Sequence, residues 1–335
     1  MNKSTSRPIL AILSIAVVAV FFILAQSEVE HDEPLIGRLS IAASKTVSPA
    51  LIWVAQDKGF FRKVGLDVTV KPYSSGKTTT EAMLRKEIDL SASAEFLAAR
   101  KSYNHKELRV FGTLAFVHQI KLLGLRTQGI ESLTDIKGKR IAVKLGTNGE
   151  YFLKRLLTLN GIQLDELQLI NMKPQEMKRA LAQGAVDAAF IWPPLVQQIK
   201  EHFGDTMVVF DGQPGQDYYY LLLGRKEWAE AHPDIAEQVM RALVMAEKWL
   251  QQNPQEAAVH LGEKYNVATD KMLKILEEYR FSVSFPQSLV IAMESQYQWL
   301  EQEELVTMQQ RPKLLDLLVT EPLGRVDSTR VNILH

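Results

Sequence analysis

The sequence predicts an α/β protein made of two doubly wound lobes that face each other. The chain has 335 residues, which is long enough for two lobes of ordinary size. Strand-helix-strand patterns occur in both halves of the chain. In addition, the stretch 82–92 aligns without gaps on 180–190. Together these features are typical of two similar α/β lobes.

The first strand-helix-strand unit lies at 39–70. An apolar run at 39–43 predicts a buried strand, and Ser48 and Pro49 predict a helix start, because serine is a good N-cap and proline fits the first helical position. Gly59 is the expected helix end, and 66–70 alternates as a second strand. Ligands of open α/β sheets bind at strand carboxyl ends, so the loop after 39–43 is a candidate site.

The later segments follow the same alternation and then become mostly helical. We assign lobe 1 to 37–125 together with 221–335, and lobe 2 to 126–220, with crossovers near Leu125 and Tyr220. No usable periodicity is found in 322–335. The other predicted strands are 88–92, 108–115, 120–125, 140–144, 167–171, 207–210 and 218–223, and the other predicted helices are 80–86, 150–159, 233–252, 254–265, 269–279 and 287–303.

The internal repeat supports the two-lobe prediction without reference to any family. Ile88 aligns with Val186, and Asp89 aligns with Asp187, within a helix-turn-strand unit. Few residues are identical, and any doubly wound protein repeats helix-turn-strand units. That plainer explanation therefore stays open.

Composition excludes several classes of function. Lysine plus arginine and aspartate plus glutamate both number 39, so no bulk charge points to nucleic acid. The chain has no cysteine, which excludes disulfides, thiolate zinc sites, a cysteine nucleophile and a lipobox. The sequence has no GxSxG, P-loop, HExxH or GxGxxG pattern after a strand. We therefore expect no enzyme activity, no cofactor and no metal site.

The N-terminal segment 1–27 has the pattern of an export signal. Lys3 and Arg7 precede an apolar run at 9–25, and the acidic stretch 28–33 follows. Ala25 begins a small-x-small sequence that suits cleavage. The run is long for a signal peptide and short for a spanning helix, so a removed signal and a retained membrane anchor both stay open. In either case the remainder is expected outside the cytoplasm.

Four phrases occur in an order that resembles one family of transport proteins. They are AxDKGFFxxxGLxV at 55–68, SSG at 74–76, LTDIKGKRIAVKLGT at 133–147 and GAVDAAFIWPP at 184–194. They resemble the substrate-binding proteins of nitrate, sulfonate, taurine and thiamine-precursor ABC importers. The resemblance covers roughly the chain from Gly37 onward.

This resemblance implies a type II periplasmic-binding-protein fold with a hinge and an interlobe cleft. It also implies a monomer in the periplasm, or on the outer face of the inner membrane, that captures a small-molecule solute. An ABC permease and its ATPase would be the partners. In this family the corresponding loops line the cleft, which nominates Thr46, Ser48, Tyr73, Ser74, Ser75, Gly76, Glu95, His118, Gln119, Gly146, Thr147, Asn148, Glu150 and Trp192.

Most of these residues also have a structural explanation. The hydroxyls at 74–75 could bind ligand or form a turn, and either Thr147 or Asn148 is expected to cap a helix. Trp192 follows a strand, where its ring could stack on a planar ligand or fill the core. His118 has no second histidine at metal-ligand spacing, and a lone histidine is more often structural.

Glu95 and Glu150 bear on the charge of the ligand. Both fall where helix N-termini should face the cleft. If both carboxylates point into it, the ligand carries an amine or a positive charge. The alternative is that each stabilises its own helix and never meets the ligand.

The function predicted from the sequence is solute capture by hinge closure for an ABC importer. The alternative is a membrane-anchored sensory or accessory protein that uses the same cleft to signal. An enzyme of thiamine-precursor synthesis is a third reading. The cysteine-rich motif that the resemblance associates with that activity is missing, because the chain has no cysteine.

Overall fold

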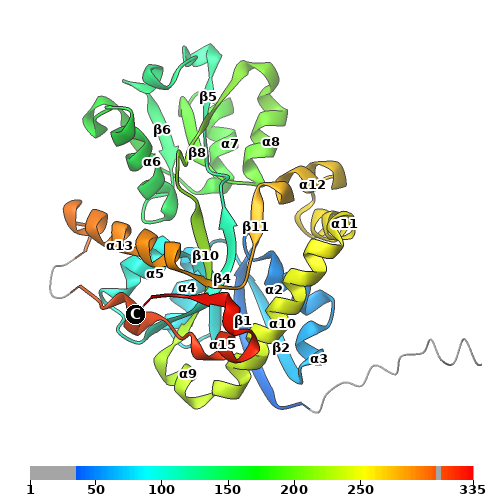
Figure 1. The fold of residues 1–335 in the computed structure, drawn as a ribbon. Helices are drawn as coiled ribbons and strands as arrows, with labels where there is room; N and C mark the ends of the chain where they lie inside the picture. Colours follow the sequence, from blue (N-terminus) through cyan, green and yellow to red (C-terminus); the bar gives the residue numbers. More distant parts are fainter. Residues whose placement is uncertain (1–34, 307–310, 335) are drawn as a thin grey trace, which may run out of the picture.

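The computed structural model describes residues 35–306 and 311–334, and these form two α/β lobes, each built on its own sheet (Figure 1). The predicted fold class is thereby confirmed. The predicted export segment 1–27 lies outside the described residues. Within the described residues, no helix combines the length and the hydropathy that crossing a bilayer requires.

Lobe 1 is built on a six-stranded sheet with the order β11-β4-β10-β3-β1-β2. The three strands β1, β2 and β3 are parallel, whereas β10 runs antiparallel to β3 and β4. All five residues of β3 are buried, as expected for a central strand. The strands are β1 (Gly37–Ser44), β2 (Leu66–Tyr73), β3 (Leu90–Ala94), β4 (Leu108–Val117), β10 (Tyr218–Arg225) and β11 (Tyr279–Phe281).

Helices from both ends of the chain cover this sheet (Figure 1). From the first part of the chain come α2 (Ala50–Asp57), α3 (Phe60–Lys63), α4 (Gly76–Leu84) and α5 (Glu95–Ser102). From the last part come α9 (Lys226–Ala231), α10 (Pro233–Gln252), α11 (Pro254–Tyr265), α12 (Thr269–Glu277), α13 (Gln287–Gln302), α14 (Leu314–Leu317) and α15 (Glu321–Val326), with the short pair β12 (Phe285–Pro286) and β13 (Val331–Asn332).

Lobe 2, drawn at the top of Figure 1, is smaller and has a five-stranded sheet with the order β7-β6-β8-β5-β9. Its strands are β5 (Lys121–Leu125), β6 (Arg140–Val143), β7 (Gln168–Asn171), β8 (Ala188–Ile191) and β9 (Met207–Asp211). Its helices are α6 (Asn148–Leu159), α7 (Pro174–Ala182) and α8 (Leu195–Phe203).

The internal repeat corresponds to equivalent structure in the two lobes. Asp89 Oδ2 accepts from the amide of Ser40 on β1 at 2.8 Å, and Asp187 Oδ2 accepts from the amide of Arg140 on β6 at 2.8 Å. The adjacent parallel pairings match as well, because Ile41 lies beside Leu90 and residue 141 lies beside residue 188. The two aspartates therefore fix the same strand pairing once per lobe.

The chain crosses between the lobes at 118–120 and 212–217, between β4 and β5 and between β9 and β10. Strand β5 therefore belongs to the sheet of lobe 2, and Tyr218 to the sheet of lobe 1, which differs from the boundaries predicted at 125 and 220. The difference has a physical reason. An apolar strand pattern marks a strand but does not tell which of two sheets will pair with it.

Gln213 joins the two crossover segments. Its Oε1 accepts from the amides of Gln119 at 2.7 Å and Ile120 at 2.8 Å, and its Nε2 donates to the carbonyl of Val117 at 2.9 Å. The side chain is fully buried. One side-chain amide thus satisfies three backbone groups, one at the end of β4 and two in the crossover segment 118–120.

Glu95 begins α5 and is fully buried. Its Oε2 accepts from the amide of Tyr219 at 3.0 Å, and its Oε1 accepts from Nε2 of Gln296 on α13 at 2.7 Å. Burial raises the pKa of Glu95 from 4.5 to about 8, although Gln296 and the backbone amides oppose the shift. The carboxyl therefore links α5, β10 and α13 inside lobe 1.

The C-terminal segment, for which the sequence predicted no structure, packs on lobe 1. Arg330 Nη1 donates to Glu247 Oε2 at 2.7 Å and to the carbonyl of Val283 at 3.0 Å. Glu247 Oε2 also accepts from the amide of Val283 at 2.8 Å. Arg325 also lies 3.8 Å from Glu237 and from Asp234 of α10, and Leu323 is fully buried in the core. Ion pairs and apolar contacts together therefore hold this segment to lobe 1.

Replacing Gln213 by alanine should destabilise the protein strongly. The substitution leaves two buried amides without an acceptor, and each such group costs about 1–3 kcal/mol. We expect urea denaturation to show a free energy of unfolding lower by roughly 2–6 kcal/mol. Gln255→Ala, at an exposed position of α11, is the control and should change little. Equal effects of the two substitutions would contradict this role of Gln213.

Glu95→Gln should change how stability depends on pH. In the unfolded chain the carboxyl loses its proton near pH 4.5, whereas the folded protein keeps it until about pH 8. The folded state thus binds more protons in this window, so the stability of the wild type should fall as pH rises from 4.5 to 8. The glutamine cannot titrate. Thermal midpoints measured across this range should decline less for Glu95→Gln, and parallel curves would refute the assignment.

Candidate functional site

A small cavity of about 40 Å³ lies between the two lobes, where strand ends of both sheets meet. Lobe 1 supplies most of its wall, and lobe 2 supplies three residues. We refer to it as the central cavity. Its lining consists of Ser44, Thr46, Ser48, Ser75, Gly76, Lys77, Ala94, Leu97, Tyr218 and Tyr220 from lobe 1, and Thr147, Asn148 and Trp192 from lobe 2.

The N-terminus of α4 forms one wall of the central cavity. Ser75 is its N-cap and accepts from the amide of Thr78 at 3.3 Å. The amides of Gly76 and Lys77 lie in the first turn, where helix geometry provides no intrahelical acceptor. A side chain at position 76 would not fit, because its Cβ would lie 2.8 Å from Ser93 Oγ. This helix end therefore presents free amides and a partial positive charge.

The N-terminus of α6 forms the opposite wall, in lobe 2. Thr147 is its N-cap, accepting from the amide of Gly149 at 3.2 Å and donating to the carbonyl of Lys144 at 2.7 Å. The adjacent Asn148 also lines the cavity. Of the two residues predicted as possible caps, Thr147 is the one that caps α6 with its side chain. Asn148 provides another amide in the first turn.

Trp192 lies at the end of β8 and closes the lobe 2 side of the cavity. A Cβ at Gly149 would lie 3.2 Å from Cζ3 of the Trp192 ring. The glycine therefore allows the ring to lie against the start of α6. Trp192 is half-buried and packs on the edge of the core, which agrees with the structural role predicted for its ring. Stacking of the ring on a ligand stays a prediction.

Hydroxyl groups cover the lobe 1 side. Ser44 Oγ lies 2.9 Å from the hydroxyl of Tyr220 and 2.8 Å from Thr46 Oγ1. A second pair is formed by Ser48 Oγ and the hydroxyl of Tyr218, which are 3.1 Å apart. Burial raises the pKa of Tyr220 to about 12 and that of Tyr218 well above its usual value. Both phenols therefore stay protonated at neutral pH and remain available as donors.

Ser48 does not cap the helix that follows it. The N-cap of α2 is Pro49, and that cap has no side-chain hydrogen bond. The prediction of a serine cap is wrong, because Ser48 Oγ forms a hydrogen bond with the hydroxyl of Tyr218 on β10 instead. This pairing places the hydroxyl at the cavity.

Positive charge is concentrated at the cavity and beside it. Lys77 is the one charged residue in the lining, and no carboxylate is among the lining residues. Arg100 of α5 lies nearby: a Cβ at Gly146 of lobe 2 would be 3.1 Å from Arg100 Nη1 and 3.8 Å from Lys77 Nζ. Within 35–306 and 311–334, neither cation has an ion-pair partner. Such a region favours an anion.

The structure brings together half of the residues predicted for the site. Thr46, Ser48, Ser75, Gly76, Thr147, Asn148 and Trp192 line the central cavity. Tyr73 and Ser74 line a neighbouring chamber on one side of it, and Gly146 and Glu150 line a chamber on the other. Glu95, His118 and Gln119 lie elsewhere.

The residues outside the cavity have other partners. His118 lies in a crossover segment, 3.0 Å from Asp217 Oδ1 and 3.1 Å from Asp211 Oδ2. Gln119 donates from Nε2 to the carbonyl of Ile275 at 3.2 Å. Both residues therefore connect elements at the lobe junction.

Neither glutamate offers a free carboxylate to the central cavity. Glu95 is buried between β10 and α13, as described above. Glu150 Oε2 accepts from the amide of Gly146 at 2.7 Å, and its Oε1 lies 3.6 Å from Lys154 Nζ. Glu95 thus links α5 to β10 and α13, and Glu150 serves its own loop and helix.

Sequence reasoning missed Lys77, Tyr218 and Tyr220, and it included Ser44 only as part of the candidate loop after 39–43. The two tyrosines had a signal, because alternate residues of the predicted return strand share a face, and that face carries both rings. Lys77 follows the nominated 74–76 loop directly. Its importance becomes visible only in the structure, where no carboxylate of the described residues forms an ion pair with it.

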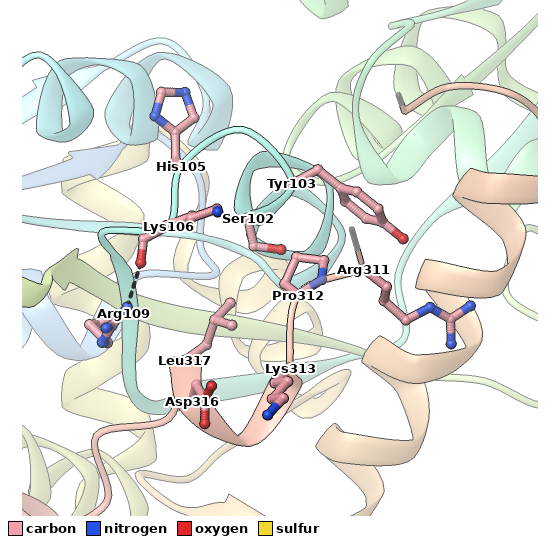
Figure 2. Close-up of a pocket in the computed structure, with 10 residues that line it drawn as sticks. All are labelled: Ser102, Tyr103, His105, Lys106, Arg109, Arg311, Pro312, Lys313, Asp316 and Leu317. Carbon is pink, nitrogen blue, oxygen red and sulfur yellow. Dashed lines mark hydrogen bonds between the residues drawn. The ribbon is translucent and has the colours of Figure 1, made fainter. Parts of the chain in front are cut away.

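Figure 2 shows a different pocket, of about 280 Å³, between the end of α5 and the segment 311–317 of lobe 1. Its arginines have partners within the chain. Arg109 Nη1 donates to the carbonyls of Lys106 at 2.9 Å and Leu108 at 2.7 Å, and Arg311 pairs with Glu301. Lobe 2 contributes none of its lining residues. We therefore take the central cavity as the candidate site.

Comparison with curated proteins identifies relatives that are named as binding proteins. A putative binding protein of Brucella abortus is 26% identical over 207 residues, which cover 61% of this chain. The match spans 64% of the length of that relative. A putative aliphatic sulfonates-binding protein of Bacillus subtilis is 27% identical over 275 residues, covering 78% of this chain and 80% of the relative.

Solved structures share the fold. The alkanesulfonate-binding protein SsuA from Xanthomonas axonopodis pv. citri, bound to MOPS, matches with a TM-score of 0.75 at 18% identity, covering 86% of this chain and 100% of that one. The desulfurization enzyme DszB matches with a TM-score of 0.67 at 12% identity, covering 88% and 99%. The fold is therefore that of SsuA-type periplasmic binding proteins, and an enzyme shares it.

The family model described as NMT1/THI5 like matches residues 48–257. Of the predicted site residues that line the central cavity, all except Thr46 fall within this range. The family resemblance seen in the sequence motifs is thereby confirmed. Because the match covers more than half of the chain, the protein belongs to the NMT1/THI5-like family.

Proposed function

We propose that this protein is the extracytoplasmic substrate-binding protein of an ABC importer and that it captures a small organic anion of the sulfonate type. It acts in the periplasm or on the outer face of the inner membrane, and it delivers its ligand to a permease and its ATPase. The names of its relatives support this class, since they are binding proteins and one is named for aliphatic sulfonates.

One observation carries the anionic nature of the ligand. The N-termini of α4 and α6 come from opposite lobes and meet at one cavity that no carboxylate lines. Free amides and the positive ends of two helix dipoles favour an anion there. Lys77 adds a full positive charge at the same place. A sulfonate, with three acceptor oxygens, suits a set of donors distributed over two lobes.

An amine-bearing ligand has less support. That expectation depended on Glu95 and Glu150 pointing into the cleft. One carboxylate is bonded to Tyr219 and Gln296, and the other accepts from Gly146. Hydroxyls of Ser44, Thr46 and Tyr220 remain as neutral partners for polar groups elsewhere on the ligand.

Closure of the lobes is the proposed means of capture. The crossover segments 118–120 and 212–217 are the covalent links between the two sheets. Hydrogen bonds of the Gln213 side chain hold the two segments side by side. Rotation about such a pair changes few backbone angles while moving a whole lobe. An anion that bonds to both α4 and α6 would stabilise the closed state.

No chemical step is part of this proposal. The chain has no cysteine, and the curated relatives reported above are named as binding proteins. The shared fold with a desulfurization enzyme does not assign its activity, because a fold accommodates many functions.

The anion should raise the thermal midpoint of the protein, and Lys77→Ala should weaken its binding. Ligand that binds the folded state alone stabilises it by mass action. Losing one charge-assisted hydrogen bond costs about 1.5–3 kcal/mol, which is roughly a 10- to 100-fold rise in Kd. Isothermal titration with methanesulfonate and with taurine would measure this rise.

Lys248→Ala is the matched control, since it removes the same charge from an exposed position of α10. It should leave both titrations unchanged. A protein that binds an aliphatic diamine but neither sulfonate would refute the proposal, as would equal affinity of the Lys77→Ala variant and the wild type.

A further inference from the structure

Two chambers of different chemistry flank the central cavity. One, of about 560 Å³, contains the unpaired Lys77 and Arg100 together with Lys101, Glu81 and Glu150. We refer to it as the basic chamber. The other, of about 490 Å³, has Tyr73 and Trp192 among its walls, with prolines at 72, 174, 193 and 194. We refer to it as the aromatic chamber.

Both chambers adjoin the central cavity through shared residues. Thr46 and Trp192 line both the cavity and the aromatic chamber, while Lys77 and Leu97 line both the cavity and the basic chamber. A ligand longer than its acidic group must therefore extend into one chamber or the other.

The basic chamber is a poor place for the remainder of the ligand. It contains Glu81 and Glu150, whose carboxylates already lie 3.5 Å from Lys101 and 3.6 Å from Lys154. A second acidic group would approach these carboxylates, and an apolar group would desolvate Lys77 and Arg100 without compensation. Four apolar residues also line the chamber, namely Leu97, Leu145, Leu305 and Val306, but they share it with three cations and two carboxylates. The basic chamber therefore adds positive potential at the cavity and is a less favourable surface for an apolar tail than the aromatic chamber.

The aromatic chamber offers a surface formed by both lobes. Tyr73 ends β2 in lobe 1, and Trp192 follows β8 in lobe 2, so the two rings reach the same chamber from opposite sides. Proline and aromatic rings have few rotamers, so little conformational entropy is lost when they contact a ligand. Gly149 leaves the Trp192 ring room against α6. A flat or apolar tail fits such a surface.

We propose that the ligand is an amphiphilic organic anion with an aryl or similarly bulky apolar tail. Its acidic group lies in the central cavity at the N-termini of α4 and α6, and its tail lies in the aromatic chamber against Trp192. This inference rests on the proposed function and names the substrate class of the same site. Trp192 and Tyr73 then determine selectivity for the tail, while the helix ends and Lys77 bind the acidic group.

The test compares sulfonates that differ only in the tail. Full-length protein is titrated calorimetrically with methanesulfonate, butanesulfonate, benzenesulfonate and naphthalene-2-sulfonate. We expect Kd to fall at least tenfold from methanesulfonate to benzenesulfonate. In Trp192→Ala and in Tyr73→Ala the ratio of these two Kd values should approach one. Tyr73→Ala is the second variant because Tyr73 does not line the central cavity.

Trp249→Ala is the control, since this half-buried tryptophan lies on α10 outside the three spaces. It should keep the wild-type ratio. If methanesulfonate binds and the aryl sulfonates bind no tighter, the tail assignment is overturned while the proposed function stands. Tighter binding of 1,2-ethanedisulfonate than of benzenesulfonate also overturns it. Binding of none of these compounds overturns both.

Discussion

The structure depends on one constraint, that the first-turn amides of a helix have no acceptor within the helix itself. In each lobe a strand ends at the cleft and the next helix starts there, at Gly76 in lobe 1 and at Asn148 in lobe 2. Ser75 and Thr147 satisfy one amide each through their side chains. The remaining donors of two lobes face one cavity, and one anion can satisfy both sets. The proposed anion would thus complete the hydrogen bonding of the two helix ends.

The two lobes achieve this arrangement by the same local device. Asp89 accepts from a backbone amide of β1, Asp187 accepts from a backbone amide of β6, and the strand pairings beside them are equivalent. This device could be predicted from the sequence, because the gapless alignment of 82–92 on 180–190 already placed the aspartates together. The helix cap at Thr147 follows from an equally local rule. The two-lobe fold and half of the site were therefore accessible.

What the sequence could not indicate depends on contacts between distant segments. Glu95 has the position of a cleft residue, yet Gln296, from another helix, and the Tyr219 amide keep it in the core. The ring nitrogens of His118 contact two aspartates that lie about a hundred residues further along the chain. Lys77 shows the converse, since its importance lies in having no ion-pair partner among residues 35–306 and 311–334. Local pattern rules contain no information about such partners, which explains why strand 121–125 was also placed in the wrong lobe.

A crystal structure grown with methanesulfonate would test the central claim most directly. The account predicts a sulfonate between the lobes, with oxygens about 3 Å from the amides of Gly76 and Asn148, so that both helix ends contact one anion. A sulfonate bound to one lobe alone, or located outside the cavity that Thr147 and Ser75 border, would contradict it.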